Sequence, residues 1–545
     1  MVWANFLHFY QPPTQKKYWV DRVTNESYRR LVNELLANPQ VKLTLNVNTV
    51  LCDLWLQYGH KDVIDGIKTL VQRGQIELTG SAKFHPLLPK MPKEEIKRQI
   101  KLNEEGIYNY FGVLPPASRS VIPGASGGTV RQPPSTGDPV GPRSGRGHGK
   151  CLSLSPGDSL RHLRGFFPPE MAYDRYVAEV VASMGYEWVI AEELSHSSKL
   201  GQVKYDRIYE VAGIPLKIFF RERNFSWRAL SGGISTPELF LRELGARVNH
   251  NEYLLTAMDG ETFGHHRPGM EKQLFDIYLH SGLTSVTISE LPALFSKREE
   301  VQTLPSTWAL METEVGINKP FSRWDDPENE IQRLQWELTD LAIGAVAAAG
   351  SASQLVSSRH AEAATVVRHK LLQPESQFEE ARNLLDRALH SDQYWWASAR
   401  PWWSLEMIER GAYELLEAIK ASRPVPPNDA GAATVCRRGT ATAVRDSVIQ
   451  EAQELYYQII TKGFEWQRTG KVDEISKKED ESVRMLTDSG LGDLPAEELD
   501  KMIAVIQKEL GAVVQNGEYE RAIQLRDRIK ELESYKKKEN PAASL

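Results

Sequence analysis

Cysteine is scarce in this sequence, with only Cys52, Cys151 and Cys436 among 545 residues. The three lie far apart and form no C-x-x-C pair, so they predict neither a structural zinc site nor a disulfide framework. This usage is typical of a reducing compartment, and we therefore expect a cytoplasmic protein.

Long hydrophobic runs and an excess of one charge are also missing. The formal net charge is −6, from 66 Lys and Arg against 72 Asp and Glu. This balance gives no reason to expect nucleic acid or an anionic membrane as a partner. No apolar stretch reaches the ~20 residues that cross a bilayer. The apolar start, Met1–Leu7, lacks a basic segment, and we interpret it as a first core strand rather than a signal peptide.

Strand-like and helical patterns alternate over roughly the first three hundred residues. A helical pattern at 62–71 is followed by further alternation downstream. The strand-like runs are 43–48, 75–80, 187–191, 216–220, 253–258 and 285–288. Such alternation predicts an α/β fold with a parallel barrel, in which functional residues lie at the C-terminal ends of the strands.

Three segments break this alternation. Residues 115–164 are rich in Pro, Gly, Ser and Arg and have no periodicity, which predicts a disordered insertion. Similar composition recurs at 345–366 and 424–444. A genuine linker and a reading-frame error in the sequence both fit this pattern.

The C-terminal part is predicted to be helical. Trp is unusually dense around 392–403, and the periodicity of Leu499–Leu532 is broken at Asn516 and Gly517, which predicts an αα-hairpin. We expect a barrel at 1–300 with the insertion at 115–164, a helical region at 301–422, a linker and helix at 423–490, and a hairpin with a tail at 491–545. Because the link before the hairpin is charged, we expect the hairpin to be separable, so that truncation near residue 490 spares the barrel and its activity.

Two carboxylates stand where strand-like runs give way to Gly, Pro and aromatic residues. Glu170 lies in GFFPPEMAYD and Asp259 in AMDGETFG. A carboxylate there is costly unless it has chemical work or an ion partner. Taken singly, Glu170 equally suits a cap for a helix starting near Met171, and Asp259 an Asp-Gly turn. The pair, each following a strand, favours acid/base and nucleophilic chemistry on a sugar.

Five short stretches together resemble glycoside hydrolase family 57, whose α-glucan-active members have an incomplete (β/α)7 barrel followed by a helical region. The resemblance covers most of residues 1–415. The stretches are His8–Pro12, Gly80–Pro89, Phe167–Glu170, Met258–Gly264 and Asp392 with Trp395 and Trp396.

The resemblance implies that Glu170 is the nucleophile and Asp259 the general acid/base of a retaining mechanism. We expect Glu170 to stay ionised among hydrogen-bond donors, and the pKa of Asp259 to be raised by Glu261 and apolar walls. The expected substrate-binding residues are His8, Gln11, His85, Arg221, Glu261, Asp392, Trp395 and Trp396.

Several of these residues also have structural interpretations. A lone histidine near a strand end is more often structural, and Arg221 with Arg223 equally suits a structural ion pair. Helix packing is the preferred interpretation for Trp402 and Trp403. The adjacent His265 and His266 should diverge in direction, which argues against a metal pair.

The C-terminal hairpin resembles a UVR motif through Ala522, Leu525-Arg526-Asp527 and Ile529. Such a motif implies helix-to-helix pairing, and hence a protein partner or self-association rather than DNA binding.

The expected function is a retaining hydrolase or transglycosylase acting on an α-1,4-glucan or maltooligosaccharide, without cofactor or metal. Amylase, 4-α-glucanotransferase and branching enzyme share the covalent glycosyl-enzyme step, and the motifs leave the choice open. One alternative is a metal-dependent polysaccharide deacetylase, which needs an early Asp-Asp pair and a His-x-x-x-His pair that we do not find. Another is a non-catalytic barrel scaffold whose hairpin recruits partners.

Overall fold

The structure is a computed structural model that describes residues 1–117, 161–361, 373–400, 402–422, 435–478 and 494–539. Most of the insertion expected at 115–164 lies outside these residues. The other two irregular segments are partly helical, because α12 (Glu330–Ala361) and α16 (Val435–Thr469) run through them. The composition of 345–366 and 424–444 was therefore a poor guide where these helices form.

Parallel strands form the wall of a barrel. They are β1 (Val2–Phe9), β2 (Leu43–Val47), β3 (Ile76–Leu78), β4 (Gly165–Phe166), β5 (Trp188–Ala191), β7 (Lys217–Phe220), β8 (Tyr253–Asp259) and β9 (Thr284–Val286). β1 is central, because it pairs with β2, β8 and β9. The apolar runs identified in the sequence supply all of these strands except the two-residue β4.

Two junctions with few backbone hydrogen bonds complete the barrel. Gly80, just after β3, forms a parallel bridge with Phe166 of β4. On the other side the Glu222 N–H donates to the Leu255 carbonyl of β8 at 2.6 Å, although β7 and β8 share no ladder among the described residues. The barrel is thus an incomplete (β/α)7 barrel, as predicted.

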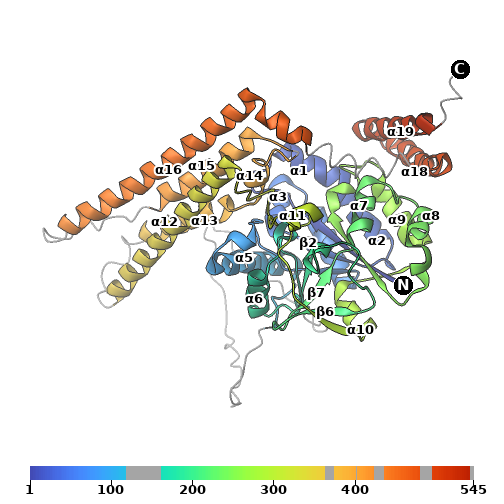
Figure 1. Cartoon of the computed structure of the whole chain (residues 1–545), viewed down its shortest axis with the longest axis horizontal. Coiled ribbons are helices and arrows are strands. Elements are labelled where there is room, and N and C mark those ends of the chain that lie inside the picture. The colour runs from blue at the N-terminus through green and yellow to red at the C-terminus, as the bar shows by residue number, and fades with distance from the viewer. Residues whose placement is uncertain (118–160, 362–372, 401, 423–434, 479–493, 540–545) are drawn as a thin grey trace, which may run out of the picture.

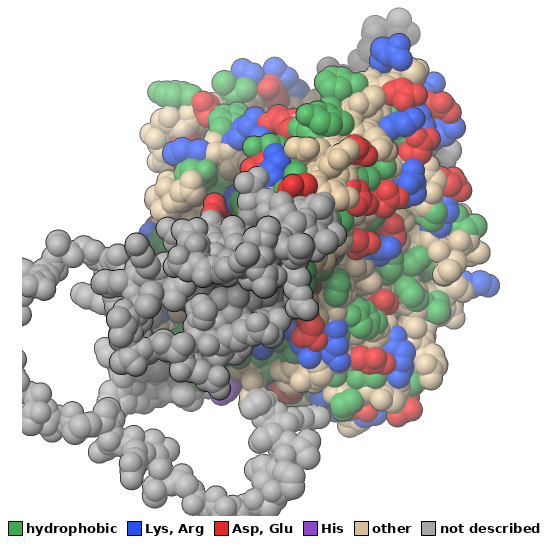
Figure 2. Space-filling model, turned by 90° about the vertical axis from the view of Figure 1, so that its left-hand side faces the viewer, with side chains coloured by type: hydrophobic (Ala, Val, Ile, Leu, Met, Phe, Trp, Pro, Cys, Tyr) green, Lys and Arg blue, Asp and Glu red, His purple; other side chains and the backbone are tan. Residues whose placement is uncertain are grey.

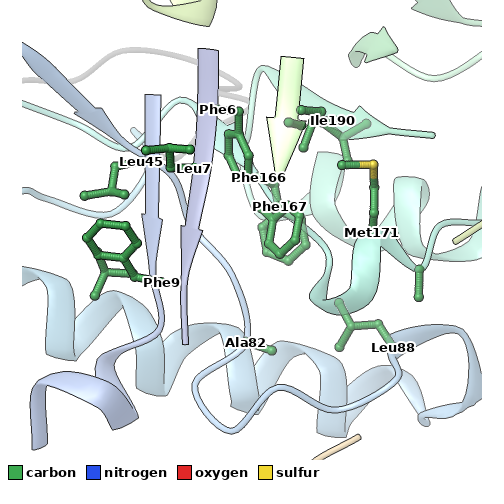
Figure 3. Close-up of a cluster of buried hydrophobic side chains, with 14 of the residues drawn as sticks. Phe6, Leu7, Phe9, Leu45, Ala82, Leu88, Phe166, Phe167, Met171 and Ile190 are labelled. Carbon is green, nitrogen blue, oxygen red and sulfur yellow. The ribbon is translucent and has the colours of Figure 1, made fainter. Parts of the chain in front are cut away.

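The barrel interior is filled by large apolar side chains. Phe6 of β1 lies against Phe167, with ring centroids 5.0 Å apart, and Figure 3 shows Phe166, Phe167 and Ile190 gathered in the same cluster. All residues of β1 except Val2 are buried, as expected for a parallel strand covered on both faces. This rigid wall places the strand ends that carry the functional side chains.

Helices surround the barrel (Figure 1). α4 shows why they form: Val63, Ile67 and Leu70 lie on one buried face at helical spacing, and Gly74 ends the helix with a φ of 76°. The barrel helices are α1 (Lys17–Val23), α2 (Arg29–Ala37), α3 (Thr49–Tyr58), α4 (Lys61–Arg73), α5 (Lys93–Phe111), α6 (Arg175–Ser183), α7 (Arg223–Ser231), α8 (Pro237–Leu244), α9 (Met270–His280) and α10 (Leu291–Leu294).

Two short strands were not predicted from the sequence, β6 (Ile208–Val211) and β10 (Arg298–Val301). β6 pairs antiparallel with β7, and β10 pairs parallel with β6. β10 escaped notice because its sequence, REEV, is mostly charged and largely solvent-facing.

Long helices follow the barrel and extend away from it (Figure 1). Buried ion pairs tie them to α5: Arg382 pairs with Glu95 at 2.7 Å and with Asp386 at 2.9 Å, and Arg98 pairs with Asp386 at 2.6 Å. Besides α12 and α16, the region contains α11 (Glu312–Val315), α13 (Gln373–Ala388), α14 (Asp392–Trp395) and α15 (Leu405–Ala421).

The C-terminal hairpin consists of α18 (Ala496–Gln515) and α19 (Tyr519–Glu539), with the break at Asn516 and Gly517 as predicted. Its small core, which includes Ile506 and Leu525, also contains Leu239 of α8. Arg30 of α2 reaches Glu509 at 3.0 Å and Glu518 at 2.6 Å. The hairpin is therefore docked on the barrel, and the effect of truncation near residue 490 stays a prediction.

Charge on the surface is mixed. On the face in Figure 2, the described Lys and Arg side chains are interspersed with Asp and Glu. Among the described residues, no helix is both long and apolar enough to cross a membrane.

Candidate active site

The strand C-termini and the helical region enclose a cavity of about 320 Å³. Most residues predicted for the site line it, including both candidate catalytic carboxylates. The lining residues are His8, Tyr10, His85, Glu170, Asp259, Glu261, His266, Trp308, Asp392, Trp395, Trp396 and Trp402. The volume lies within the ~300–1,000 Å³ range usual for ligand clefts.

Glu170 follows β4 in a short turn and has an unusual backbone conformation. Its φ is 58°, and that of His85, which lines the same cavity, is 59°. Non-glycine residues held in this region cost free energy and cluster at functional sites. Helix capping does not explain Glu170, because Asp174 caps α6 by accepting from the Val177 N–H.

Three groups surround the Glu170 carboxyl. Trp308 Nε1 donates to Oε2 at 3.0 Å, Ser391 Oγ donates to Oε1 at 3.3 Å, and His85 Nδ1 lies 3.5 Å from Oε1. Burial and the charges of Asp392 and Asp259 nevertheless raise the pKa of Glu170 to about 8, and the two donors oppose this only partly. The expected donors are thus present, but they do not keep the pKa in the usual range.

Asp259 ends β8, directly beside His8 of β1 in the strand register. Burial raises its pKa to about 7, against the opposing charge of Arg221. The predicted direction of this pKa shift is confirmed, but its cause is burial and not the predicted charge of Glu261. Glu261 is affected in turn: burial and the charge of Asp259 raise its pKa to about 8, despite hydrogen bonds from Tyr28 and Gln11.

Asp392 contrasts with the other three carboxyls. Burial alone would raise its pKa, but hydrogen bonds with His390 at 3.2 Å and Tyr10 at 2.6 Å lower it below the usual value. Asp392 is therefore the carboxylate that carries negative charge most readily, and this charge helps to keep Glu170 protonated.

His8 and His85 line the cavity, and each has one ring nitrogen without a hydrogen-bond partner among the described residues. Their Nδ1 atoms contact Asn46 at 2.8 Å and Ser391 at 3.1 Å, whereas neither buried Nε2 has a partner among the described residues. Burial lowers the pKa of His8 to about 4, and burial together with His8 lowers the pKa of His85 well below its usual value. Both rings are thus neutral near pH 7 and suited to hydrogen-bond a ligand hydroxyl.

Two predicted substrate-binding residues lie behind the cavity wall. Gln11 Nε2 donates to Glu261 Oε1 at 2.7 Å, and Arg221 forms a buried ion pair with Glu192 at 2.5 Å. Arg221 also donates to the Trp308 carbonyl at 2.8 Å. Because neither lines the cavity, their assignment as substrate contacts is replaced by a supporting role, and Arg221 follows the structural ion-pair interpretation.

Aromatic side chains form much of the remaining wall. Trp402 lines the cavity and is 59% exposed, so packing does not account for it. Trp403 does pack, stacking on Trp466 at 5.8 Å between ring centroids. Three further lining residues were not predicted as substrate contacts: Tyr10 lies within the first motif, His266 follows the Met258–Gly264 stretch, and no motif marked Trp308.

The arrangement offers carboxyl, imidazole and aromatic groups but no metal centre that we can identify. The described part of the chain contains no group of three or more His, Cys, Asp or Glu residues placed to hold a metal ion. The groups that line the cavity are carboxyls beside neutral donors and apolar ring faces.

The glycosyl hydrolase family 57 model matches residues 7–119 and 161–304, and the UvrB/uvrC motif matches residues 500–535. Alpha-amylase 1 of Dictyoglomus thermophilum is 29% identical over 109 residues, covering 20% of this chain and 16% of that protein. The 4-alpha-glucanotransferase of Thermococcus litoralis is 27% identical over 96 residues, covering 18% and 14%. The chain thus spans only about a sixth of the length of these relatives.

The solved GH57-type branching enzyme of Pyrococcus horikoshii has the same fold, with a TM-score of 0.53 at 15% identity, covering 85% of this chain and 96% of that chain. Family match, motifs and barrel agree. The barrel region of the chain matches the model of glycosyl hydrolase family 57, and its C-terminal hairpin matches the UVR motif.

Proposed function

We propose that this protein is a retaining glycoside hydrolase or transglycosylase acting on α-1,4-glucans. The observation that carries the proposal is the shared cavity in which Glu170 and Asp259 lie beside two neutral histidines and a tryptophan wall. The named relatives, an alpha-amylase and a 4-alpha-glucanotransferase, support a glucan as substrate.

Glu170 is the proposed nucleophile. It attacks the anomeric carbon and forms a glycosyl ester, while Asp259 donates its proton to the leaving oxygen. Asp259 then withdraws a proton from the incoming water or sugar hydroxyl, whose oxygen displaces Glu170. The raised pKa of Asp259 suits an acid that must be protonated when the substrate arrives.

Catalysis requires a particular distribution of protons between Glu170 and Asp259. The productive form needs an ionised Glu170 and a protonated Asp259, although burial favours protonation of both. Trp308 and Ser391 stabilise the ionised Glu170, and the positive charge that develops on the sugar favours it further in the transition state. The pair therefore titrates as a coupled unit.

The surrounding groups suit a pyranose ring. The unpartnered Nε2 atoms of His8 and His85 can bind ring hydroxyls, and the ionised Asp392 can accept from others. Trp395, Trp396 and Trp402 offer apolar faces that match the C–H faces of glucose units.

The test is incubation with maltooligosaccharides of defined length, resolving shortened, elongated and branched products and the anomer formed first. Retention of the α-configuration, lost in Glu170→Gln, would support the proposal. As a matched control, Glu179→Gln changes a glutamate in an ion pair on the surface of α6 and should leave the products unchanged. Inversion, or wild-type turnover by Glu170→Gln, would refute the mechanism.

A further inference from the structure

The loop between β8 and α9 begins directly after the candidate acid/base Asp259 and carries two other cavity residues, Glu261 and His266. On its inner side it is held by η1 (Thr24–Tyr28), a π-helical turn. Ser27 Oγ donates to the Gly260 carbonyl at 2.7 Å, and Tyr28 OH donates to Glu261 Oε1 at 3.0 Å.

The contact between loop and turn leaves little free space. Gly264 has a φ of 113°, and a Cβ there would lie 2.1 Å from the carbonyl oxygen of Glu26. Glu26 also contacts His265 Nδ1 at 2.5 Å. A displacement of this loop would therefore be transmitted along a short, tightly packed segment to Asp259.

The C-terminal hairpin holds the other side of the same loop. Arg521 of α19 donates to the Gly264 carbonyl at 2.7 Å and forms an ion pair with Glu271 at the start of α9. The Glu271 side chain is fully buried and that of Arg521 is 5% exposed. A buried ion pair between two elements holds them together, because separation leaves an uncompensated charge.

A second hairpin contact reaches the loop through η1. Gln524, one turn after Arg521, donates to Glu26 Oε1 at 2.6 Å, and Glu26 binds His265 through its other oxygen. Gly269, where the loop meets α9, lies beneath the hairpin: a Cβ there would be 2.9 Å from Ile506. The hairpin therefore contacts the loop directly at Gly264 and at Gly269, and indirectly through Glu26.

We propose that Arg521 and Gln524 are positioning residues that hold the β8–α9 loop, and with it Asp259 and Glu261, in the geometry of the cavity. The hairpin thereby acts as a part of the catalytic unit, in addition to any role in association. The proposal rests on the proposed role of Asp259, and it reverses the expectation that removal of the hairpin spares activity.

The test compares Arg521→Ala with Arg526→Ala in the full-length protein. Arg526 is the matched control, because it lies on the same helix, is 54% exposed and pairs with the neighbouring Asp527. Amide hydrogen exchange over residues 260–270 should accelerate in Arg521→Ala and not in Arg526→Ala. Gln524→Ala, at a less buried position, provides the same comparison if Arg521→Ala does not fold.

Kinetics give a second readout that general destabilisation would not produce. With a maltooligosaccharide, kcat/KM of Arg521→Ala should fall ~10- to 100-fold, mostly through kcat, because the acid is misplaced. With an activated aryl α-glycoside the loss should be several-fold smaller, because the leaving group needs little protonation. Arg521→Lys should recover part of the loss.

Exchange and kinetics that match those of Arg526→Ala would overturn the inference, as would equal losses on both substrates. A wild-type protein inactive on every glucan would refute the proposed function. In that case the exchange contrast still decides whether the hairpin holds the loop.

Discussion

Replacing Glu170 with Gln should stabilise the folded protein at alkaline pH while abolishing turnover. The amide is nearly isosteric with the carboxyl and can keep accepting from Trp308 Nε1. Unlike the carboxyl, it cannot ionise in a buried cavity that already contains the charge of Asp392. The variant thus removes a free-energy cost that the wild-type site bears as pH rises.

The sign and size follow from the raised pKa, 4.5 to about 8. Below pH 4.5 both folded and unfolded states hold the proton, and Glu170 costs nothing. Between pH 4.5 and about pH 8 only the unfolded state releases this proton, so the free energy of unfolding falls as pH rises. Above about pH 8 both states have released it, and the free-energy cost of the buried Glu170 charge is constant. The full shift corresponds to about 5 kcal/mol. Because the side chain keeps 18% exposure and neighbouring carboxyls share the proton, we expect roughly half of this.

The assay is thermal unfolding of wild type and Glu170→Gln at pH 5 and pH 9. The variant should gain roughly 3–6 °C at pH 9 and little at pH 5. Glu179→Gln, at an exposed pair, should show no such pH dependence. An equal gain at both pH values would mean that ionisation of Glu170 is not the cause, and a loss at pH 9 would refute the reasoning.

Four further outcomes are expected. Asp259→Asn should lose ~10²- to 10⁴-fold in kcat/KM on maltooligosaccharides, and far less on activated aryl glycosides; equal losses would argue against an acid role. The pH profile of kcat/KM should be bell-shaped with a maximum near pH 7–8, because the raised pKa values of Glu170 and Asp259 shift both limbs of the profile to higher pH. A maximum near pH 5 would contradict these shifts. Glu192→Gln should lower the free energy of unfolding by about 3–5 kcal/mol, since Arg221 would stay buried without its partner, as urea titration can show. Activity should survive a chelator, and its loss with recovery on adding metal would favour the deacetylase alternative.

Much of the barrel could be predicted from local pattern. Apolar runs bounded by turn residues identified the strands because parallel strands are buried on both faces. Glu170 and Asp259 were identifiable because carboxylates after such runs are conspicuous. The same logic indicated the two-residue β4 only through the short apolar run before Glu170, and it failed for β10, whose charged residues resemble a loop.

Other features of the site depend on tertiary contacts that leave no local mark. Trp308 lies in an irregular segment, and only its hydrogen bond to Glu170 reveals it. Arg221 directly follows a strand, which is a position typical of a catalytic residue. Its side chain nevertheless forms an ion pair with Glu192. The docking of the hairpin through Arg521 joins residues 250 positions apart, which no periodicity can indicate.

The contribution of the helical region to the cavity has a consequence for biosynthesis. Asp392 contacts Tyr10, which is synthesised 382 residues earlier. Ser391 contacts Glu170, which is synthesised 221 residues earlier. A nascent chain that has completed β8 can fold its barrel, but its cavity still lacks the Asp392 carboxylate and the side chains of Trp395, Trp396 and Trp402. The cavity should therefore close late during synthesis, after the segment around residue 400 has left the exit tunnel and α13 has docked on α5.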